Sequence, residues 1–269
     1  MAFISTEIKI YETATTVPVQ LYFPTDLPAT VGNKVKGVIT LLHGMGNTPS
    51  DWMQFSAAPR YAADNGYILV APDAQASFYA DMACGTPWYT ILTEYLPAQL
   101  GRIFKIPTER EMNYIAGLSM GGYGAMRIGL AHPERYAAIG SFSGCLDMRR
   151  MAEESHLPGA PPILAPVLGP NFDLPPELDV MELLKKVAEL PADQQPKLYC
   201  TCGLQDTELP NVKQQNETFR ALAESLPVTY AFREWQGVHE WNFWDRSLAE
   251  FIGYIQGSDY GARKRADWS

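Results

Sequence analysis

The feature that most constrains this chain is a series of short, nearly continuous apolar runs separated by stretches compatible with helices. The apolar runs are "KGVITLLHGMG", "GYILVAPD", "MNYIAGLS", "YAAIGSFSG", "PKLYCTCG" and "VTYAFREW". Uniformly apolar runs of this length are typical of strands buried on both faces. The helix-compatible stretches cover roughly 51–65, 91–104, 121–131, 211–226 and 241–256. This alternation predicts an α/β fold in which helices cover both faces of a mostly parallel sheet.

Two further segments near the N-terminus predict an antiparallel addition to that sheet. In "TEIKIY" and "VPVQLYFP" apolar and polar residues roughly alternate, as they do in half-buried strands. A chain of 269 residues suits one large α/β domain. We therefore expect a single domain over residues 1–269.

One segment interrupts the alternation of strands and helices. Residues 146–196 should form a single crossover, yet they number about fifty, and seven prolines lie between Pro158 and Pro176. A structureless loop of this length is unusual in a compact domain unless it has a function. Its apolar residues, which are Ile163, Leu164, Val167 and Leu168, favour a cap-like insertion over the active site, with a surface excursion as the alternative.

Charge and hydropathy narrow the classes of partner. A net charge of −9 and a pI near 5.0 argue against nucleic acid and anionic membrane surfaces. The one basic cluster, "ARKRADWS" at residues 262–269, is interpreted as a solvated tail rather than a binding arm. The sequence contains neither a run of 18 apolar residues nor a signal peptide pattern, so we expect no membrane association and a cytoplasmic location.

The four cysteines, Cys84, Cys145, Cys200 and Cys202, fit reduced cytosolic thiols better than a disulfide framework. Cys200 and Cys202 lie two apart on an expected strand, so they should share one face and pack as small hydrophobic residues. The sequence has no H-x-H, H-E-x-x-H or G-x-x-x-x-G-K-[ST] pattern. We therefore expect neither a metal site nor a phosphate-binding loop.

The stretch "G-L-S-M-G" at Gly117–Gly121 matches the G-x-S-x-G nucleophile elbow. That motif is a sharp strand-to-helix turn, which holds the serine in a strained conformation with its hydroxyl exposed. The glycines two residues before and after Ser119 keep the strand and the helix from colliding. The flanking segments fit, because "MNYIAG" is a plausible strand and "GGYGAMRIGLAH" a plausible helix.

A serine hydroxyl needs a general base, and in this architecture the order along the chain is Ser, acid, His. Three histidines follow Ser119. His132 lies at the end of the helix that starts at the elbow, and His156 lies in the proline-rich insertion, where a base would be poorly anchored. His239, in "WQGVHEWNFWD", directly follows the last expected strand and is the predicted base.

The acid should also follow a strand. Asp206, in "YCTCGLQDTELP", comes after a strand and a glycine turn, and Glu208 is the fallback. Asp179 and Asp193 belong to the insertion and are interpreted as surface charges, whereas Asp245 follows the predicted base and so violates the expected order. Asp206 would fix the tautomer of the histidine, and the histidine would take the proton from the serine.

An oxyanion hole requires two backbone N–H groups. One comes from the residue after the nucleophile, here Met120, and the other from a loop after an early strand. In "LLHGMGN" Gly44 and Gly46 allow close approach of the backbone, and we assign the second donor to Met45. His43 lies in the same loop; we expect it to orient the loop by hydrogen bonding and also count it among the candidate substrate contacts.

At this point the motifs resemble a known family. "LLHGMG", "SFYADMACGTPWYT", "IAGLSMGGYGAMRIGLAHPERY", "SFSG" and "GVHEWNFWD" resemble the esterase D and tributyrin-esterase branch of the α/β-hydrolases, whose relatives include feruloyl esterases, S-formylglutathione hydrolases and mycolyltransferases. The resemblance spans roughly residues 1–145 and 197–255. It implies an α/β-hydrolase fold and ester hydrolysis through an acyl-serine without a cofactor, and it favours a homo-oligomer. Carried over by position, it names the same residues: Ser119, Asp206 and His239, with Met45 and Met120.

The resemblance also places "SFYADMACGTPWYT" near the substrate cleft, which makes Tyr79, Trp88 and Tyr89 candidate contacts; filling of the core is the alternative for each. Trp241 is a further candidate because it follows the predicted base on a helix, whereas Trp244 is expected to pack in the core. The thiol-rich loop associated with formylglutathione hydrolases is not evident after "LLHG", which speaks against a glutathione thioester substrate.

The sequence therefore predicts a serine carboxylesterase acting on small, short-chain acyl esters, with a small-molecule ester as its partner. A feruloyl or cinnamoyl esterase is the alternative within the enzymes, and acyl transfer to an alcohol is another. The alternative from a different class is a catalytically silent α/β-hydrolase fold that serves as a binding protein. The complete set of Ser, Asp and His, together with both glycine-rich turns, argues against the silent fold.

Overall fold

The computed structural model describes residues 1–25, 34–160, 162–207, 211–258 and 260–261. The fallback acid Glu208 and the basic C-terminal cluster lie outside the described residues.

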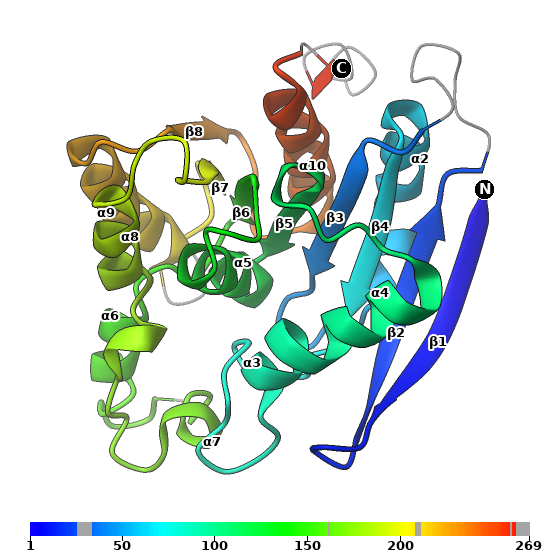
Figure 1. Cartoon of the computed structure of the whole chain (residues 1–269). Helices are drawn as coiled ribbons and strands as arrows, with labels where there is room; N and C mark the ends of the chain where they lie inside the picture. Colours follow the sequence, from blue (N-terminus) through cyan, green and yellow to red (C-terminus); the bar gives the residue numbers. More distant parts are fainter. Residues whose placement is uncertain (26–33, 161, 208–210, 259, 262–269) are drawn as a thin grey trace.

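Eight strands form one sheet in the order β1-β2-β4-β3-β5-β6-β7-β8 (Figure 1). The strands are β1 Ala2–Ile10, β2 Thr15–Phe23, β3 Gly37–Leu42, β4 Tyr67–Pro72, β5 Asn113–Leu118, β6 Ala138–Phe142, β7 Lys197–Gly203 and β8 Tyr230–Trp235. Neighbours from β4 to β8 pair in parallel, whereas β1 with β2 and β2 with β4 pair antiparallel. Both the parallel sheet and the antiparallel addition predicted from the sequence are confirmed.

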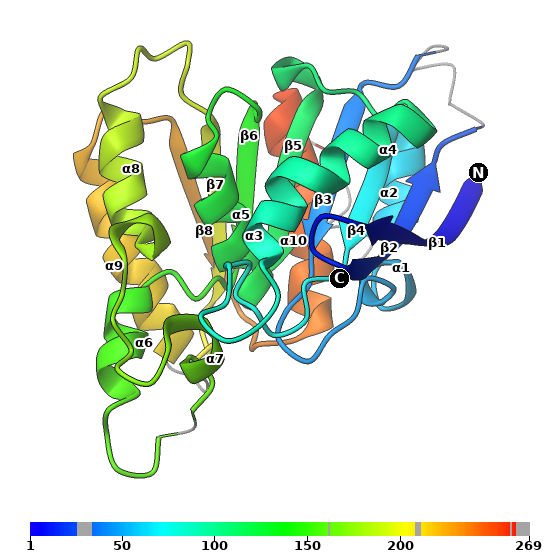
Figure 2. The same ribbon diagram turned by 60° about the horizontal axis from the view of Figure 1, so that its bottom comes forward.

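Helices cover both faces of this sheet (Figures 1 and 2). The helical segments are α1 Asp51–Gln54, α2 Ala58–Asn65, α3 Trp88–Thr90, η1 Ile91–Tyr95, α4 Leu96–Phe104, η2 Arg110–Met112, α5 Met120–Ala131, α6 Met148–Glu154, α7 Ala165–Leu168, η3 Pro176–Leu178, α8 Val180–Ala188, α9 Val212–Ser225 and α10 Trp241–Gln256. None of the helices in the described ranges is both long enough and apolar enough to span a bilayer.

Alternation along the strands divides the interior into two cores. On β7, Leu198, Cys200 and Cys202 point to the core under α4, α5, α8 and α9, whereas Tyr199 points to the core under α1, α2 and α10. Both cysteines are fully buried on one face, as the sequence predicts. Burial raises the pKa of the Cys200 thiol to about 12, so it stays protonated and packs as a small apolar group.

The helix predicted over 51–65 is broken into α1 and α2. The break comes just before Pro59, whose nitrogen cannot donate to the preceding turn. Instead the Ala57 N–H donates to the Asp245 carboxylate at 2.6 Å, which ties the break to α10. Because Tyr61 also donates to Asp245, at 2.7 Å, this aspartate is a structural link, consistent with its exclusion as the catalytic acid.

The helix predicted over 91–104 begins three residues earlier and contains a π-helical turn at Ile91–Tyr95. Pro97 lies at the start of α4 and has no N–H to donate to the carbonyl of Thr93. That carbonyl accepts a hydrogen bond from Arg135 instead, at 2.6 Å. A long-range side chain thus satisfies the backbone group that proline leaves without a partner.

The segment 146–196 is not the structureless excursion that its prolines suggest. It contains α6, α7, η3 and α8, and α8 packs its apolar face on α5 and α9. The expectation that Asp179 is a surface charge is wrong. Its carboxylate is buried, accepts from the Met181 N–H at 3.0 Å to cap α8, and pairs with Arg149 at 2.7 Å. Capping aspartates of this kind favour helix initiation.

Candidate active site

Ser119 lies in the turn between β5 and α5 in a strained backbone conformation. Its φ of 53° and ψ of −121° fall in a region that L-residues rarely adopt. The strain is held by hydrogen bonds on both sides of the turn: the Ser119 N–H donates to the Phe142 carbonyl at 2.9 Å, and the Tyr123 N–H donates to the Ser119 carbonyl at 3.1 Å. The side chain therefore projects at the carboxyl edge of the sheet, where the elbow motif places it.

The two glycines of the motif are required by close contact between backbones. A Cβ at Gly117 would lie 2.3 Å from the carbonyl oxygen of Gly121, and a Cβ at Gly121 would lie 2.3 Å from that of Leu42. Strand β5, helix α5 and the end of β3 thus meet with no room for a side chain between them. The sequence-based reason for these glycines is confirmed.

Three side chains from three different strand ends converge at this edge. The Ser119 Oγ lies 2.8 Å from Nε2 of His239, and Nδ1 of His239 lies 3.1 Å from both carboxylate oxygens of Asp206. Asp206 is buried, at 1 % exposure, and can only accept, so Nδ1 carries the proton and Nε2 offers its lone pair to the hydroxyl. The arrangement can draw the proton from the serine and stabilise the imidazolium that results.

Gln205 joins the loops that carry the acid and the base, a role that the sequence analysis missed. Its backbone N–H donates to the Gly237 carbonyl at 3.1 Å, and its side-chain oxygen accepts from the Gly237 N–H at 2.7 Å. These two bonds hold the residue before Asp206 against the residue two before His239. A single sequence offers no signal for such a clamp, because both partners are ordinary loop residues.

The two predicted oxyanion donors lie in suitable loops. Met120 is the first residue of α5, and Met45 lies in a turn closed by the Asn47 N–H, which donates to the Gly44 carbonyl at 3.1 Å. Within the described residues, neither the Met45 N–H nor the Met120 N–H has a hydrogen-bond partner. Both are therefore free to donate to an oxyanion.

His43 is a buried support of that turn. Because the Ala74 N–H donates to Nε2 at 3.1 Å, Nδ1 carries the proton and donates to the Gly44 carbonyl at 2.8 Å. Tyr79 donates its hydroxyl to the His43 carbonyl, also at 2.8 Å. Both residues are fully buried, so their prediction as substrate contacts is wrong. His43 and Tyr79 support the loop from the protein interior, where a substrate cannot contact them.

The other two candidates from the same segment also lie away from the serine. Trp88 is buried at 1 % exposure, so its predicted contact with substrate is wrong for the same reason. Tyr89 is half-buried, and its hydroxyl lies 2.9 Å from Nε2 of His132, the residue that ends α5. Ser119 precedes the opposite end of that helix, so the substrate contact of Tyr89 stays a prediction.

A row of aromatic rings leads from the base to the surface. Trp244 is buried and meets His239 edge-to-face at 4.9 Å between ring centroids. Trp241 contacts Trp244 at 5.5 Å and Phe55 at 5.7 Å. Phe55 is 56 % exposed and Trp241 is partly exposed, so this end of the row is open to a ligand. Trp241 thus stays a candidate contact, and Phe55 is an addition that the sequence analysis did not make.

Cys145 is a second unforeseen neighbour of the nucleophile. It follows β6 at the carboxyl edge, and its N–H lies 3.4 Å from the Ser119 carbonyl, which accepts from it. Burial raises the pKa of the Cys145 thiol to about 12. A thiol that remains protonated is a poor nucleophile, so it does not compete with the serine.

The remaining histidines lie outside the site. The His156 ring is exposed and packs edge-to-face on Phe172 at 5.2 Å, within the insertion. Burial lowers the pKa of His132, which keeps that ring neutral beside Tyr89. In the part of the chain that the structure describes, no three His, Cys, Asp or Glu side chains are grouped so that they could hold a metal ion.

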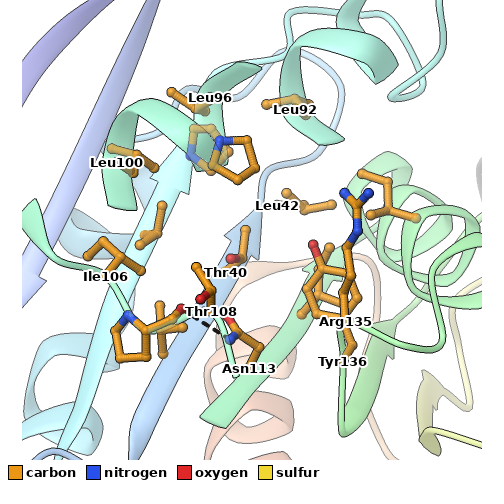
Figure 3. A pocket seen from close by; sticks show the side chains of 17 residues that line it. Thr40, Leu42, Leu92, Leu96, Leu100, Ile106, Thr108, Asn113, Arg135 and Tyr136 are labelled. Carbon is orange, nitrogen blue, oxygen red and sulfur yellow. Dashed lines mark hydrogen bonds between the residues drawn. The ribbon is translucent and has the colours of Figure 1, made fainter. Parts of the chain in front are cut away.

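An apolar cavity of about 130 Å³ lies between α4 and the sheet (Figure 3). Leu92, Leu96 and Leu100 line it from the helical side, and Leu42 and Asn113 from the sheet. The lining includes Asn113 at the amino end of β5, and none of the three converging side chains lines the cavity. It is therefore distinct from the candidate active site.

Comparison with known proteins agrees with the fold and identifies the family. The family model described as "Putative esterase" matches residues 11–255. An acetyl esterase from Caldicellulosiruptor saccharolyticus is 26% identical over 221 residues, which are 80% of this chain and 81% of the relative.

Two solved structures show the same architecture. FphF, a fluorophosphonate-binding serine hydrolase of Staphylococcus aureus, superposes with a TM-score of 0.80 at 26% identity, covering 94% of this chain and 98% of its own. A ferulic acid esterase superposes with a TM-score of 0.74 at 19% identity, covering 94% of this chain and 97% of its own. At that identity the second match bears on the fold alone.

Proposed function

This chain is a serine hydrolase that belongs to the putative esterase family, and we propose that it hydrolyses small, short-chain acyl esters through an acyl-serine intermediate. The observation that carries the proposal is the continuous relay from the Ser119 Oγ through His239 to Asp206, with contacts of 2.8 Å and 3.1 Å. A catalytically silent fold would have no need of such a relay or of a strained serine.

In the first half of the proposed reaction the Ser119 Oγ attacks the ester carbonyl. His239 Nε2 takes the hydroxyl proton, and Asp206 stabilises the imidazolium. The Met45 and Met120 N–H groups donate to the oxyanion. Loss of one such donor typically costs roughly 2.7–4 kcal/mol of transition-state stabilisation.

In the second half His239 gives its proton to the leaving alkoxide, which departs as the alcohol and leaves an acyl ester on Ser119. A water then approaches the acyl carbon and loses its proton to His239 Nε2. The tetrahedral intermediate collapses, the carboxylic acid leaves, and the serine hydroxyl recovers its proton. Every group in this reaction belongs to the chain, to the ester or to the attacking water.

The preference for a small acyl group is supported by the similarity to an acetyl esterase. The test is hydrolysis of p-nitrophenyl acetate, butyrate and octanoate at neutral pH by wild type and by Ser119→Ala. We expect turnover that falls from the shorter esters to the octanoate and that is lost in the variant. A rate that rises with chain length would contradict the short-chain proposal and leave the serine mechanism intact.

The aromatic row favours a second candidate, hydrolysis of a hydroxycinnamate ester. The exposed Phe55 and the partly exposed Trp241 could stack on a cinnamoyl ring beside His239. Methyl ferulate and methyl butyrate distinguish the two candidates. If the aromatic substrate is the preferred one, Phe55→Ala should raise its KM selectively; an equal effect on both esters would contradict stacking.

A further inference from the structure

A second polar site lies further along α5, outside the candidate active site. Arg127 of α5, Tyr89 and residues of the insertion enclose a cavity of about 380 Å³, which we call the Arg127 cavity (Figure 1 shows the elements around it). Its volume is within the range of small-molecule pockets, roughly 300–1,000 Å³. Arg127 follows Ser119 by eight residues, about 12 Å along the helix at 1.5 Å per residue. The Arg127 cavity is therefore separate from the catalytic serine.

The base of the Arg127 cavity is a buried guanidinium. Arg127 is only 4 % exposed, and its Cζ lies 3.9 Å from the centroid of the Tyr89 ring. Its Nη1 donates to the Tyr79 carbonyl, but among the described residues its Nε has no partner and no carboxylate lies within ion-pair distance. Burial lowers the pKa of Arg127, and the charges of Asp81 and Glu177 at the rim oppose this shift only in part. A buried charge is costly unless something pairs with it, so the site calls for an anionic group.

The rim of the Arg127 cavity has the opposite charge. Asp81, Asp173 and Glu177 all line it and are all exposed. The Asp81 carboxylate is held by Thr90, which donates from its N–H at 2.9 Å and its hydroxyl at 2.7 Å. A simple anion would be repelled at this rim, and a simple cation would meet the guanidinium at the base. A zwitterion satisfies both ends.

The remaining wall of the Arg127 cavity is apolar. Val167 and Leu168 of α7, together with Leu178 and Ala131, line the space between base and rim. We propose that the Arg127 cavity binds a free α-amino acid with an apolar side chain. The carboxylate accepts from the Arg127 guanidinium, the ammonium group faces the acidic rim, and the side chain lies against the apolar wall.

The test is isothermal titration of wild type with three probes that share one side chain: L-leucine, L-leucinamide and 4-methylpentanoate. L-leucinamide lacks the carboxylate, and 4-methylpentanoate lacks the ammonium group. We expect saturable binding of L-leucine, with each of the other probes at least about tenfold weaker, as the loss of one charge-assisted contact implies. The same titrations with Ser119→Ala separate this proposal from the esterase proposal, because binding should persist without the nucleophile.

Two variants locate the charges. Arg127→Met should abolish binding of L-leucine. Because that change alters a buried residue, the second variant, Asp173→Asn with Glu177→Gln, changes only exposed side chains of the rim. This rim variant should at least halve the ratio by which L-leucine binds more tightly than 4-methylpentanoate. The matched control is Glu7→Gln with Glu234→Gln, which removes two exposed carboxylates from β1 and β8 and should leave that advantage unchanged.

Three results would overturn the proposal. The first is the absence of saturable L-leucine binding to folded wild type. The second is binding of 4-methylpentanoate as tight as that of L-leucine, which would show that the ammonium group is not recognised. The third is an identical ratio of L-leucine affinity to 4-methylpentanoate affinity in the rim variant and in its control.

Discussion

Helix α5 carries a polar group near each end, and the fold surrounds the two groups in different ways. At the N-terminal end the Ser119 hydroxyl meets His239, and the chain itself supplies the next partner, Asp206. Toward the C-terminal end the Arg127 guanidinium is buried more deeply than Ser119, yet its Nε has no partner among the described residues. The difference teaches that a catalytic relay is complete without its substrate, whereas a buried guanidinium with one donor unpaired and no carboxylate in contact points to a ligand.

Among the variants that compare the two ends of α5, Asp206→Asn is expected to have the largest effect on turnover. The amide would donate to Nδ1 of His239 and force the proton onto Nε2. The protonated Nε2 can no longer accept the hydroxyl proton of Ser119. We expect kcat for p-nitrophenyl acetate to fall by about 10⁴-fold. Binding of L-leucine in the same variant should not change. Loss of both esterase turnover and L-leucine binding would show that the two ends of α5 form one site.

A smaller effect is expected from Gly121→Ala at the elbow. Its Cβ would lie 2.3 Å from the Leu42 carbonyl oxygen and 2.7 Å from that of His43, so the loop after β3 must move. Overpacking of this kind typically lowers the free energy of unfolding by about 1–3 kcal/mol. The displaced loop carries Met45, so kcat should fall as well. Denaturant unfolding and steady-state kinetics measure the two changes.

The matched control for Gly121→Ala is Gly101→Ala in α4. The nearest atom outside its own helix to a Cβ there is 3.9 Å away, so the new methyl group meets no obstacle. Alanine is also the better helix former, and stability should rise by about 0.4–1 kcal/mol. Equal destabilisation by both substitutions would contradict the close-contact account of the elbow.

The smallest effect is expected from Gln205→Ala, which removes the side-chain half of the clamp between the acid and base loops. The hydrogen bonds of the Gln205 side chain to the Gly237 N–H and to the Gln236 side chain are both lost, each at a net cost of at most about 0.5–1.5 kcal/mol. If the clamp aligns Asp206 with His239, kcat should fall about two- to tenfold while KM changes little. Gln194→Ala, which removes an exposed side chain from the loop before β7, serves as the control. Equal kinetics for the two variants would mean that the clamp has no role in alignment.

The sequence was sufficient for the parallel sheet and for the elbow, because both depend on local patterns. Apolar runs mark buried strands, and the glycines at 117 and 121 mark the point where backbones touch. Chain order then selected Asp206 and His239, and the structure brings both of them to Ser119. The carboxyl ends of parallel strands meet at one edge, so knowledge of the topology was enough to place them together.

Features that depend on contacts between distant segments could not be predicted. The burial of His43 and Tyr79 follows from how the segment after β4 folds under the loop that carries Met45, and Trp88 is buried in the hydrophobic core. The same holds for Asp179, a charged residue in a proline-rich stretch that proved to cap a helix. Residue type alone does not distinguish an aromatic side chain that lines a cleft from one that supports it.

The most direct test of the central claim is covalent labelling of the nucleophile. Wild type and Ser119→Ala are each incubated with diisopropyl fluorophosphate, and the adduct is mapped by peptide mass spectrometry alongside turnover of p-nitrophenyl acetate. The account predicts a single adduct on Ser119 in wild type, no adduct in the variant, and a loss of kcat on the order of 10⁶-fold. An adduct on another residue, or undiminished turnover by folded Ser119→Ala, would contradict it.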